Sequence, residues 1–397
     1  MKTPKILWGS PLPPTRSGIS DHAAELLPHL ARQVEVTILE PPGWKPPADA
    51  AWLSGLQRLP WDAPTPAGSL TLLHLGNNPY HLWVARRLRR VGGMAVLHDT
   101  VLHHLLVEEA AADGDWQHFA KELGETHGQG GTALAAARRW GYHGRLDPFL
   151  FPARASFLRS ASAVIVHTRL AEREVASSCP GLPIRRVPLA VAEPAAGDRL
   201  AWRDRLGIRG QELLLVHLGF LTPAKGLDVI LRGLAALATM GVQARLVVVG
   251  EGSEASAFEA AVALAGLEER VRVWGYASKD ELGGILAAAD LGLVPRYPTA
   301  GETSAAALRF LAAGTTVAVA GYRQFLELPR AAALRIAPGR AGVSDLVRVV
   351  VGLARDEGQR MRARADARKA WADGGHDPTE AASTLLAALG ELARDVA

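Results

Sequence analysis

The sequence predicts an α/β fold of two Rossmann-like domains that face each other across a cleft. Its 397 residues exceed what one ordinary core holds and suit two domains of about 200 residues each. Hydrophobic residues (48%) and charged residues (21%) occur in the proportions of a globular protein, which excludes a disordered chain. Short runs rich in Val, Ile and Leu alternate with longer stretches at helical spacing. Such an alternation forms parallel sheets with helices on both faces.

The predicted strands are short and continuously apolar, as strands buried on both faces must be. In the first half of the chain they are residues 5–8, 35–39, 70–75, 94–97, 163–166 and 185–189. In the second half they are residues 213–218, 244–249, 271–274, 291–294, 316–320 and 334–336. Helical spacing between them is clear at residues 21–32, 228–240 and 254–265.

The series of strands pauses near residues 191–211, where a stretch with Pro and Gly precedes a polar helical piece. We therefore expect a first Rossmann-like domain over residues 1–190, a linker over 191–211 and a second such domain over 212–376. A helical insertion is expected at about 104–150. Asp377 and Pro378 mark the start of a last helix, over 377–397, that can cross back to the first domain.

Composition bears on the setting of the protein. The single cysteine, Cys179, excludes an intramolecular disulfide and favours a reducing compartment such as the cytoplasm. We expect no signal peptide, because Lys2 and Lys5 lead straight into a short strand pattern. We expect no membrane span, because no apolar run approaches about 20 residues. A net charge of +4 without a basic stripe argues against nucleic-acid binding.

One predicted helix carries the densest group of basic residues: Arg86, Arg87, Arg89 and Arg90. Two interpretations are open. The group contacts an anionic membrane surface or a lipid-linked acceptor, which would place the protein at the inner membrane face, or it is a solvated helix face.

The loop after the first strand, residues 11–22, is rich in Pro and Gly and opens into a helix. Gly18 lets a ligand approach the backbone, and the helix start offers N–H groups to an anion. Asp21 suits either a cap or a partner for an acceptor hydroxyl. The same pattern also fits an ordinary turn between a strand and a helix.

The loop from Gly219 to Gly226 directly follows a strand, and Lys225 stands at the start of the next helix. A lysine charge together with helix N–H groups suits a diphosphate. The alternative is a surface lysine beside a capping glycine.

A third loop, residues 296–304, follows the strand at 291–294 and leads into a helix over 305–313. Glu302, Thr303 and Ser304 suit helix capping. The competing interpretation is a site at which amides of this loop, beginning at Gly301, meet phosphate and Glu302 meets sugar hydroxyls.

Histidines follow another strand end: His98 and Asp99, then His103 and His104. They suit helix ends or the core. Zinc binding is conceivable, but the spacing matches no common zinc motif, so we expect no metal. The Asp113-Gly-Asp115 triplet could hold Mn²⁺ or Mg²⁺. Its place between two helical patterns favours a turn with an N-cap instead.

These loops together resemble glycosyltransferase family 4, retaining enzymes of the GT-B fold, most strongly between residues 213 and 330. The family's "G-R-L-x-x-x-K-G" loop is matched at 219–226, its "V-V-V-G-x-G" strand end at 247–252, and its "E-A-M-A-x-G" segment at 301–314. Pro13, Pro14 and Gly18 match its N-terminal loop. His98 matches a histidine that, in the family, lies near the acceptor and the reacting carbon.

The sequence departs from the family at three positions. Phe220 stands where the family has the arginine of the phosphate loop, and Lys225 is the one cation left in that loop. The family's paired glutamates, which contact the donor sugar and ribose, fall at Gly301 and Arg309, so Glu302 matches only with a shift of one residue. Arg309 can replace the lost phosphate charge.

The resemblance implies a retaining glycosyltransferase with no cofactor and no metal, and with donor and acceptor in different domains. We expect the donor in the second domain, with GDP-mannose favoured and UDP and dTDP sugars open, and a carbohydrate or lipid-linked acceptor in the first. His98 and Glu302 are the expected catalytic residues. Asp21 and Asp99 are expected on the acceptor side. The expected donor-binding residues are Gly18, Gly219, Lys225, Gly301, Thr303, Ser304 and Arg309.

The alternative is a binding or scaffold subunit of the same fold that has lost its chemistry. An NAD-dependent oxidoreductase is disfavoured because no Gly-x-Gly-x-x-Gly follows the first strand. An epimerase lacks a pair of residues that could act as its acid and base.

Overall fold

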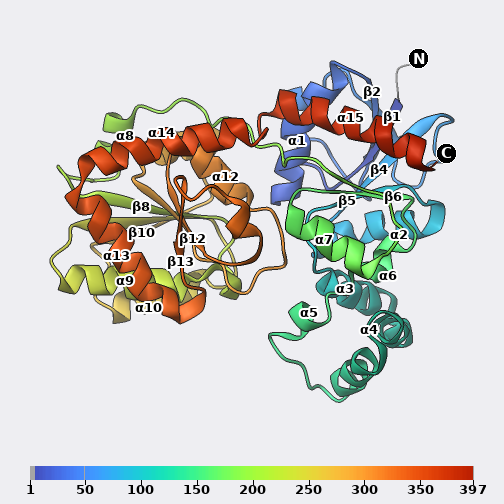
Figure 1. The fold of residues 1–397 in the computed structure, drawn as a ribbon, viewed down its shortest axis with the longest axis horizontal. Helices are drawn as coiled ribbons and strands as arrows, with labels where there is room; N and C mark the ends of the chain where they lie inside the picture. The colour runs from blue at the N-terminus through green and yellow to red at the C-terminus, as the bar shows by residue number, and fades with distance from the viewer. Residues whose placement is uncertain (1–4, 49, 397) are drawn as a thin grey trace. The chain divides into compact units, whose positions relative to one another are not determined.

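The structure, a computed structural model, describes residues 5–48 and 50–396. The chain divides into two compact units. Unit 1 comprises residues 1–190, 300–303 and 378–397, and unit 2 comprises residues 191–299 and 304–377. Residues 1–4, 49 and 397 of the predicted domains lie outside the described part. Each unit is a parallel sheet covered by helices (Figure 1), which confirms the predicted pair of Rossmann-like α/β domains.

The sheet of unit 1 contains seven described strands, all paired in parallel. They are β1 (Lys5–Gly9), β2 (Glu35–Glu40), β3 (Gln57–Pro60), β4 (Ser69–Leu75), β5 (Met94–Leu97), β6 (Ala163–Val166) and β7 (Ile184–Arg186). Their order is β3-β2-β1-β4-β5-β6-β7. The order reverses between β1 and β4, and ligands bind outside the carboxyl ends of the strands at such a switch point.

Two strands of unit 1 differ from the prediction. The sequence does not predict β3, because this edge strand is mostly exposed and lacks the apolar run of a buried strand. The strand expected at 185–189 ends at Arg186. Val187 still donates to the Val166 carbonyl oxygen over 2.9 Å, but Pro188 has no N–H with which to extend the ladder.

Alternate residues of these strands point to opposite faces of the sheet. One face, which includes Leu7 and Leu73, packs against α2 (Leu82–Val91), α6 (Arg154–Leu158) and α7 (Arg169–Ser178). The other face, which includes Ile6 and Trp8, packs against α1 (Gly18–Ala31) and α15 (Pro378–Val396). The last helix therefore completes the core of unit 1.

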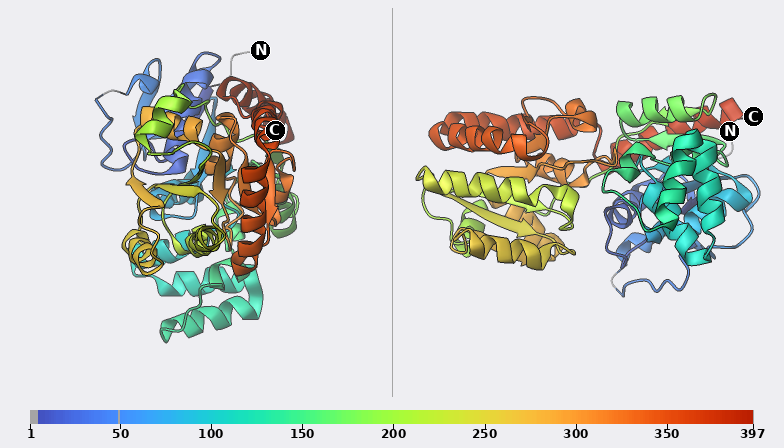
Figure 2. Two further views of the ribbon diagram at one scale, coloured as in Figure 1. Left: turned by 90° about the vertical axis from the view of Figure 1, so that its left-hand side faces the viewer. Right: turned by 90° about the horizontal axis from the view of Figure 1, so that it is seen from below.

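The predicted helical insertion consists of α3 (His103–Asp113), α4 (Trp116–Arg139) and α5 (Asp147–Leu150). These helices lie together at one end of unit 1 in the views of Figure 1 and Figure 2. Only part of α3 and α4, including Leu105, Phe119 and Leu123, enters the core.

Unit 2 repeats the same architecture with six described strands in parallel. They are β8 (Leu213–Leu218), β9 (Ala244–Val249), β10 (Val271–Gly275), β11 (Leu291–Val294), β12 (Val317–Ala320) and β13 (Ala333–Ile336). Their order, β10-β9-β8-β11-β12-β13, reverses between β8 and β11. The loops that carry Lys225 and Arg296 follow these two strands.

Seven α-helices of the described chain belong to unit 2. They are α8 (Arg199–Arg205), α9 (Leu227–Thr239), α10 (Ala255–Leu264), α11 (Lys279–Ala288), α12 (Ala305–Ala312), α13 (Gly342–Arg355) and α14 (Glu357–Asp373). The segment 191–211, predicted as a linker, is part of this unit. Its helix α8 is fixed by Arg203, which bonds to Asp290 over 2.9 Å.

Within residues 5–48 and 50–396, no helix has both the length and the apolar character that crossing a bilayer requires.

Candidate active site

In unit 2 the loops that follow β8 and β11 meet at the switch point of the sheet. The N–H of Tyr297 donates to the carbonyl oxygen of Ala224 over 2.9 Å. Gly226 has a φ of +72°, and a Cβ at this position would lie 2.5 Å from the carbonyl oxygen of Pro295. Only glycine tolerates both this backbone conformation and this close approach. The lysine loop, residues 219–226, is thus held against the loop after β11.

The turn after β9 also packs against the lysine loop. The N–H of Leu221 donates to the carbonyl oxygen of Glu251 over 2.9 Å. A Cβ at Gly250 would lie 2.1 Å from the Gly219 carbonyl oxygen, and one at Gly252 would lie 2.4 Å from that of Leu221. The Gly-x-Gly of this turn therefore has a packing role: it lets two backbones touch.

Two cations lie near the ends of β8 and β11. The Nζ of Lys225 is 3.2 Å from the position that a Cβ of Gly219 would take, so the lysine folds back over its own loop. The pKa of His217, in β8, is lowered to about 3, first by burial and then by the Lys225 charge. A bond to the Leu293 carbonyl oxygen opposes this shift, and Arg296 adds a smaller lowering effect. Arg296 is therefore a candidate site residue that the sequence analysis missed, although it follows a strand end closely.

Helix α12 begins in the same unit. Ser304 is its N-cap: the buried hydroxyl oxygen accepts from the N–H of Ala307 over 3.2 Å, as the capping interpretation predicts. Thr303 and Glu302 precede the helix and belong to unit 1. Arg309 lies in the last turn of α12, away from the N–H groups of its first turn.

The short segment 300–303 is bound within unit 1 to the residues that follow β5. The Ala300 carbonyl oxygen accepts from the N–H groups of Thr100, over 2.8 Å, and Val101, over 3.1 Å. Gly301 has a φ of +76°, and a Cβ there would lie 2.0 Å from the Thr100 hydroxyl oxygen. This segment, which contains Glu302, is thus fixed beside the chain that carries His98 and Asp99.

Asp99 is oriented by the loop after β4. One of its carboxylate oxygens accepts from the N–H of Asn77 over 2.7 Å. A Cβ at Gly76 would lie 3.2 Å from the same oxygen. The loop after β4, a strand at the switch point of unit 1, thus fixes the Asp99 carboxylate that follows β5.

Gly18 and Asp21 lie in the first turn of α1. Ser17 caps this helix and accepts from the N–H of Ser20 over 3.1 Å, and the side chain of Asp21 is exposed. A Cβ at Gly18 would meet no atom of the described residues within 4 Å. The packing of the chain does not itself require glycine at this position.

His103, His104 and the Asp113-Gly-Asp115 triplet have structural roles, which the sequence analysis gave as alternatives to metal binding. His103 donates to the Phe151 carbonyl oxygen over 2.8 Å, and His104 pairs with Glu108. Asp115 is the N-cap of α4, and Asp113 pairs with Arg86, so this triplet serves a turn.

The four arginines of α2 do not form one open basic face. Arg87 is buried and donates to the carbonyl oxygens of Trp61 and Ala63. Arg89 pairs with Glu109, and Arg90 lies over the Trp61 ring. Arg86 and Arg90 remain exposed, and Arg86 pairs with Asp113, so the arginines of this helix take different structural roles.

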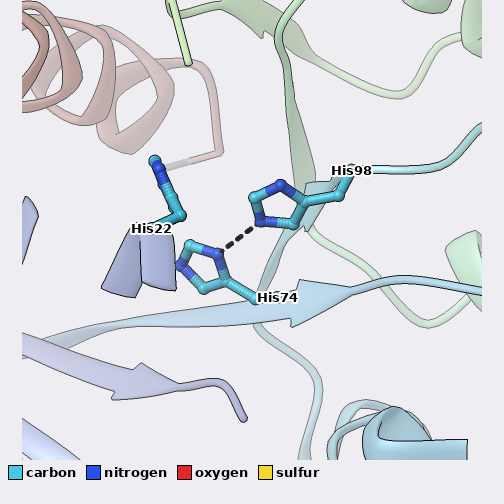
Figure 3. A group of neighbouring side chains, drawn as sticks. All are labelled: His22, His74 and His98. Carbon is cyan, nitrogen blue, oxygen red and sulfur yellow. Dashed lines mark hydrogen bonds between the residues drawn. The ribbon is translucent and has the colours of Figure 1, made fainter. Parts of the chain in front are cut away.

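A histidine cluster lies in unit 1 at the carboxyl ends of its strands. It consists of His22 in α1, His74 near the end of β4, His98 after β5 and His167 after β6. Figure 3 shows His22, His74 and His98 side by side, with His74 Nδ1 and His98 Nε2 2.9 Å apart. The His98 and His167 ring centroids are 4.9 Å apart. The sequence analysis identified only His98. His74 and His167 could have been found as polar residues at neighbouring strand ends, whereas His22 lies in α1.

Burial keeps the central rings of this cluster neutral. It lowers the pKa of His98 well below the ordinary value, and the neighbouring His167 and His74 lower it further. The pKa of His74 is lowered in the same way, first by burial and then by His22 and His167. Neutral imidazoles can accept a hydrogen bond or bind a metal ion.

The chain is similar to known proteins in both sequence and fold. Residues 198–369 match the family described as glycosyl transferases group 1. A 2-deoxystreptamine glucosyltransferase of Streptomyces kanamyceticus is 32% identical over 163 residues, which are 41% of this chain and 41% of that protein. A GDP-mannose-dependent alpha-(1-6)-phosphatidylinositol dimannoside mannosyltransferase of Mycobacterium tuberculosis is 33% identical over 46% of this chain and 45% of its own length. The matches thus span less than half the length of these relatives.

Solved structures are similar over almost the whole chain. A sucrose-phosphate synthase from Thermosynechococcus elongatus has a TM-score of 0.69 at 16% identity, with 98% of each chain covered. Alr3699/HepE of Anabaena, solved with UDP and glucose, has a TM-score of 0.62 at 16% identity, over 98% of this chain and 99% of that one. At such identities the likeness concerns the fold. Residues 198–369 thus form a group-1 glycosyltransferase domain within a chain of GT-B fold, which confirms the family predicted from the sequence.

Proposed function

We propose that this protein transfers a sugar from a nucleoside diphosphate sugar to a hydroxyl group of a carbohydrate or lipid-linked acceptor. The observation that carries the proposal is the pair of cations, Lys225 and Arg296, on two loops joined at the switch point of unit 2. A diphosphate is strongly anionic, and charge that develops on it during the reaction is stabilised by preorganised cations and N–H groups. The match of residues 198–369 to the glycosyltransferase family supports the same use.

We assign roles in donor and acceptor binding to the other predicted residues. Gly219 leaves room for a phosphate beside Lys225. The N–H groups in the first turn of α12, after Ser304, can donate hydrogen bonds to an anion.

The sugar and the nucleotide are contacted by other residues. Gly301, Glu302 and Thr303 contact the sugar, and Arg309 contacts the nucleotide. Gly18 lets the donor approach α1. Asp21 and Asp99 bind acceptor hydroxyls.

The transfer proceeds with retention of configuration. The acceptor oxygen forms a bond to the anomeric carbon on the face from which the diphosphate leaves. The bond from that carbon to the phosphate oxygen breaks, and its electron pair stays on the phosphate. The acceptor's proton passes to this same oxygen. No enzymatic nucleophile is needed, so the proposal requires only positioning and charge stabilisation from the chain.

His98 orients the sugar beside the reacting carbon. The lowered pKa keeps its imidazole neutral, so one ring nitrogen carries a proton and can donate to a sugar hydroxyl. The bond between His98 Nε2 and His74 Nδ1 holds the ring in place. Glu302, on the segment bound to Thr100, contributes negative charge near the same carbon.

The transfer needs no metal ion at the diphosphate. The two aspartates of the Asp-x-Asp triplet have other partners: Asp113 pairs with Arg86, and Asp115 is the N-cap of α4. Lys225 and Arg296 supply the positive charge that Mg²⁺ or Mn²⁺ would otherwise supply. Addition of either ion after brief chelation should leave the initial rate unchanged, and a rate that requires the ion would contradict this part of the proposal.

GDP-mannose is the favoured donor. The name of the mycobacterial relative states dependence on GDP-mannose, whereas Alr3699/HepE was solved with UDP. The deciding experiment is a thermal-shift series with GDP, UDP, ADP and dTDP, followed by turnover of the corresponding sugars. Selective stabilisation by GDP is expected, because a ligand that binds only the folded state raises its stability. No stabilisation by any of the four would overturn the proposed function.

We further propose peripheral contact with an anionic membrane through the end of the insertion, which suits a lipid-linked acceptor. Between α4 and α5 the exposed fractions of Trp140 (82%), Tyr142 (74%) and Leu146 (55%) are large. Exposed arginines, Arg139 and Arg145, lie among them. Aromatic and basic side chains together suit a lipid headgroup region.

Sedimentation with vesicles tests this contact. The protein should sediment with phosphatidylglycerol vesicles more than with phosphatidylcholine vesicles, and the W140S/Y142S variant should lose most of this binding. The matched control is Met361→Ser, which removes an exposed apolar side chain from unit 2. Equal binding by the control and the double variant would contradict the assignment.

The binding-subunit alternative rests on Phe220 and Arg309, which replace family residues. Arg296 weakens it, because a cation is again available beside Lys225. Stabilisation by a nucleoside diphosphate without turnover of any donor, alone or with acceptors, would favour this alternative.

A further inference from the structure

The histidine cluster supplies imidazoles from four separate elements to one buried place. His22, His74 and His98 are 5%, 1% and 8% exposed. One nitrogen from each of these three lies within 4.8 Å of the other two. His167 stands beside them, with its ring centroid 4.9 Å from that of His98 and 6.0 Å from that of His22. No carboxylate belongs to this group among the described residues.

Backbone carbonyls fix the tautomers of two of these rings. The Nδ1 of His22 is 3.2 Å from the Ala190 carbonyl oxygen, and that of His167 is 2.9 Å from the Val187 carbonyl oxygen. A carbonyl oxygen only accepts, so each Nδ1 carries the proton and each Nε2 carries a lone pair. Metal-binding histidines have this arrangement: one nitrogen binds the ion, and the other donates to a carbonyl or carboxylate.

The central pair is arranged to accept an ion between its rings. His74 Nδ1 and His98 Nε2 share a single proton across 2.9 Å. The second nitrogen of His74, Nε2, is buried and has no hydrogen-bond partner among the described residues. His74 can therefore offer a lone pair from either nitrogen after a change of tautomer.

We propose that His22, His74 and His98 bind a divalent ion of the zinc type, with His167 placed to act as a fourth ligand. Zinc bonds to histidine nitrogen are about 2.1 Å long, which separates tetrahedral ligand nitrogens by about 3.4 Å. The measured limit of 4.8 Å requires the rings to move together by small side-chain rotations. Imidazole nitrogens select zinc and its neighbours over Mg²⁺ and Ca²⁺, which prefer oxygen.

This ion is distinct from any ion at the donor diphosphate, which the proposed function excludes. The ligands all belong to unit 1, whereas Lys225 and Arg296 belong to unit 2. An ion on His98 Nε2 would fix the proton of this ring on Nδ1 and replace the bond to His74 as its support. Its role is to position His98.

Metal content and metal affinity test the proposal on the full chain without an affinity tag. The protein is stripped with a chelator and titrated with Zn²⁺ against a chromophoric competitor, and bound zinc is counted by mass spectrometry. We expect one equivalent. His74→Asn and His22→Gln should each bind at least tenfold more weakly, since even changes in outer-shell partners cost 10–100-fold. His143→Gln, an exposed histidine of the insertion, is the matched control and should bind normally.

Cobalt gives a second readout that is independent of activity. Co²⁺ in a tetrahedral nitrogen site should give strong visible absorption that is lost in both cluster variants. Circular dichroism and stabilisation by nucleotides should remain, which separates loss of the ion from loss of the fold or of the proposed function. Binding of less than a tenth of an equivalent, or equal affinity in the wild type and His74→Asn, would overturn the proposal.

Discussion

Gly250 faces the carbonyl oxygen of Gly219 so closely that a Cβ would lie 2.1 Å from it. This approach joins the turn after β9 to the loop that carries Lys225. The position of the lysine thus depends on a neighbouring strand as well as on its own loop. Phosphate binding in unit 2 should therefore respond to changes that touch no charged residue.

Gly250→Ala should destabilise unit 2 and weaken nucleotide binding. The added methyl would overlap backbone, and its φ of +141° is unfavourable for alanine. We expect a loss of about 2 kcal/mol or more in the free energy of unfolding, measured by urea denaturation. The control is Gly390→Ala in α15, where a Cβ meets nothing within 4 Å of the described residues and helix propensity favours alanine. Equal stability of the two variants would show that the turn can move away.

Lys225→Ala should reduce diphosphate binding and turnover about tenfold or more. A charge-assisted bond contributes about 1.5–3 kcal/mol, and each 1.4 kcal/mol is a factor of ten. Titration calorimetry with the nucleoside diphosphate and kcat/KM for its sugar measure the effect. Lys279→Ala, an exposed lysine at the start of α11, should bind and react as the wild type does. Unchanged kinetics for Lys225→Ala would remove this lysine from the site.

Arg296→Ala should cause a loss of the same size, because it removes the second cation beside His217. The family has its arginine at the position of Phe220, whose side chain is 45% exposed. A second change, Phe220→Arg, should therefore recover part of the binding in the Arg296→Ala background. Calorimetry on the two single variants and the double variant measures the recovery. Full binding by Arg296→Ala alone would contradict the assignment of this arginine.

His217 should make unit 2 less stable in acid. The pKa of His217 is about 3 in the folded state and 6.5 for an unperturbed histidine. Between these pH values the unfolded state binds a proton that the folded state does not bind. Stability from this group is intact above pH 6.5 and falls as the pH drops toward 3, by about 1.4 kcal/mol per unit.

Urea denaturation between pH 7.5 and 5, followed by tryptophan fluorescence and circular dichroism, should show this slope. His217→Gln should flatten it, because glutamine does not titrate. The exposed His143→Gln is the control and should keep the slope of the wild type. A slope that persists in His217→Gln would show that other groups cause the acid sensitivity.

Much of the fold could be predicted from the sequence because buried parallel strands leave continuous apolar runs. All strands except the exposed β3 were expected within a few residues. The assignment of residues 300–303 to unit 1 could not be predicted. It depends on the Ala300 carbonyl oxygen bonding to Thr100 and Val101, two hundred residues away in the chain, and no local pattern marks such a pairing.

The candidate site was predictable only where one loop carries the signal. Lys225, Gly226 and Ser304 lie on loops that follow strands, and Ser304 caps α12 as one interpretation predicted. Arg296 becomes a site residue only through the bond between Tyr297 and Ala224, which depends on strand order. The histidine cluster escaped notice for the same reason, because its members come from α1 and from three strand ends that only the sheet brings together.

The placement of α15 has a consequence for biosynthesis. One face of the unit 1 sheet is covered partly by Ala381, Leu385 and Leu389, which leave the ribosome after all of unit 2. Domains that emerge first usually fold first, but here the early domain keeps apolar surface in water until translation ends. A chain stalled before residue 378 should therefore recruit chaperones through its first half, even though the second half is already complete.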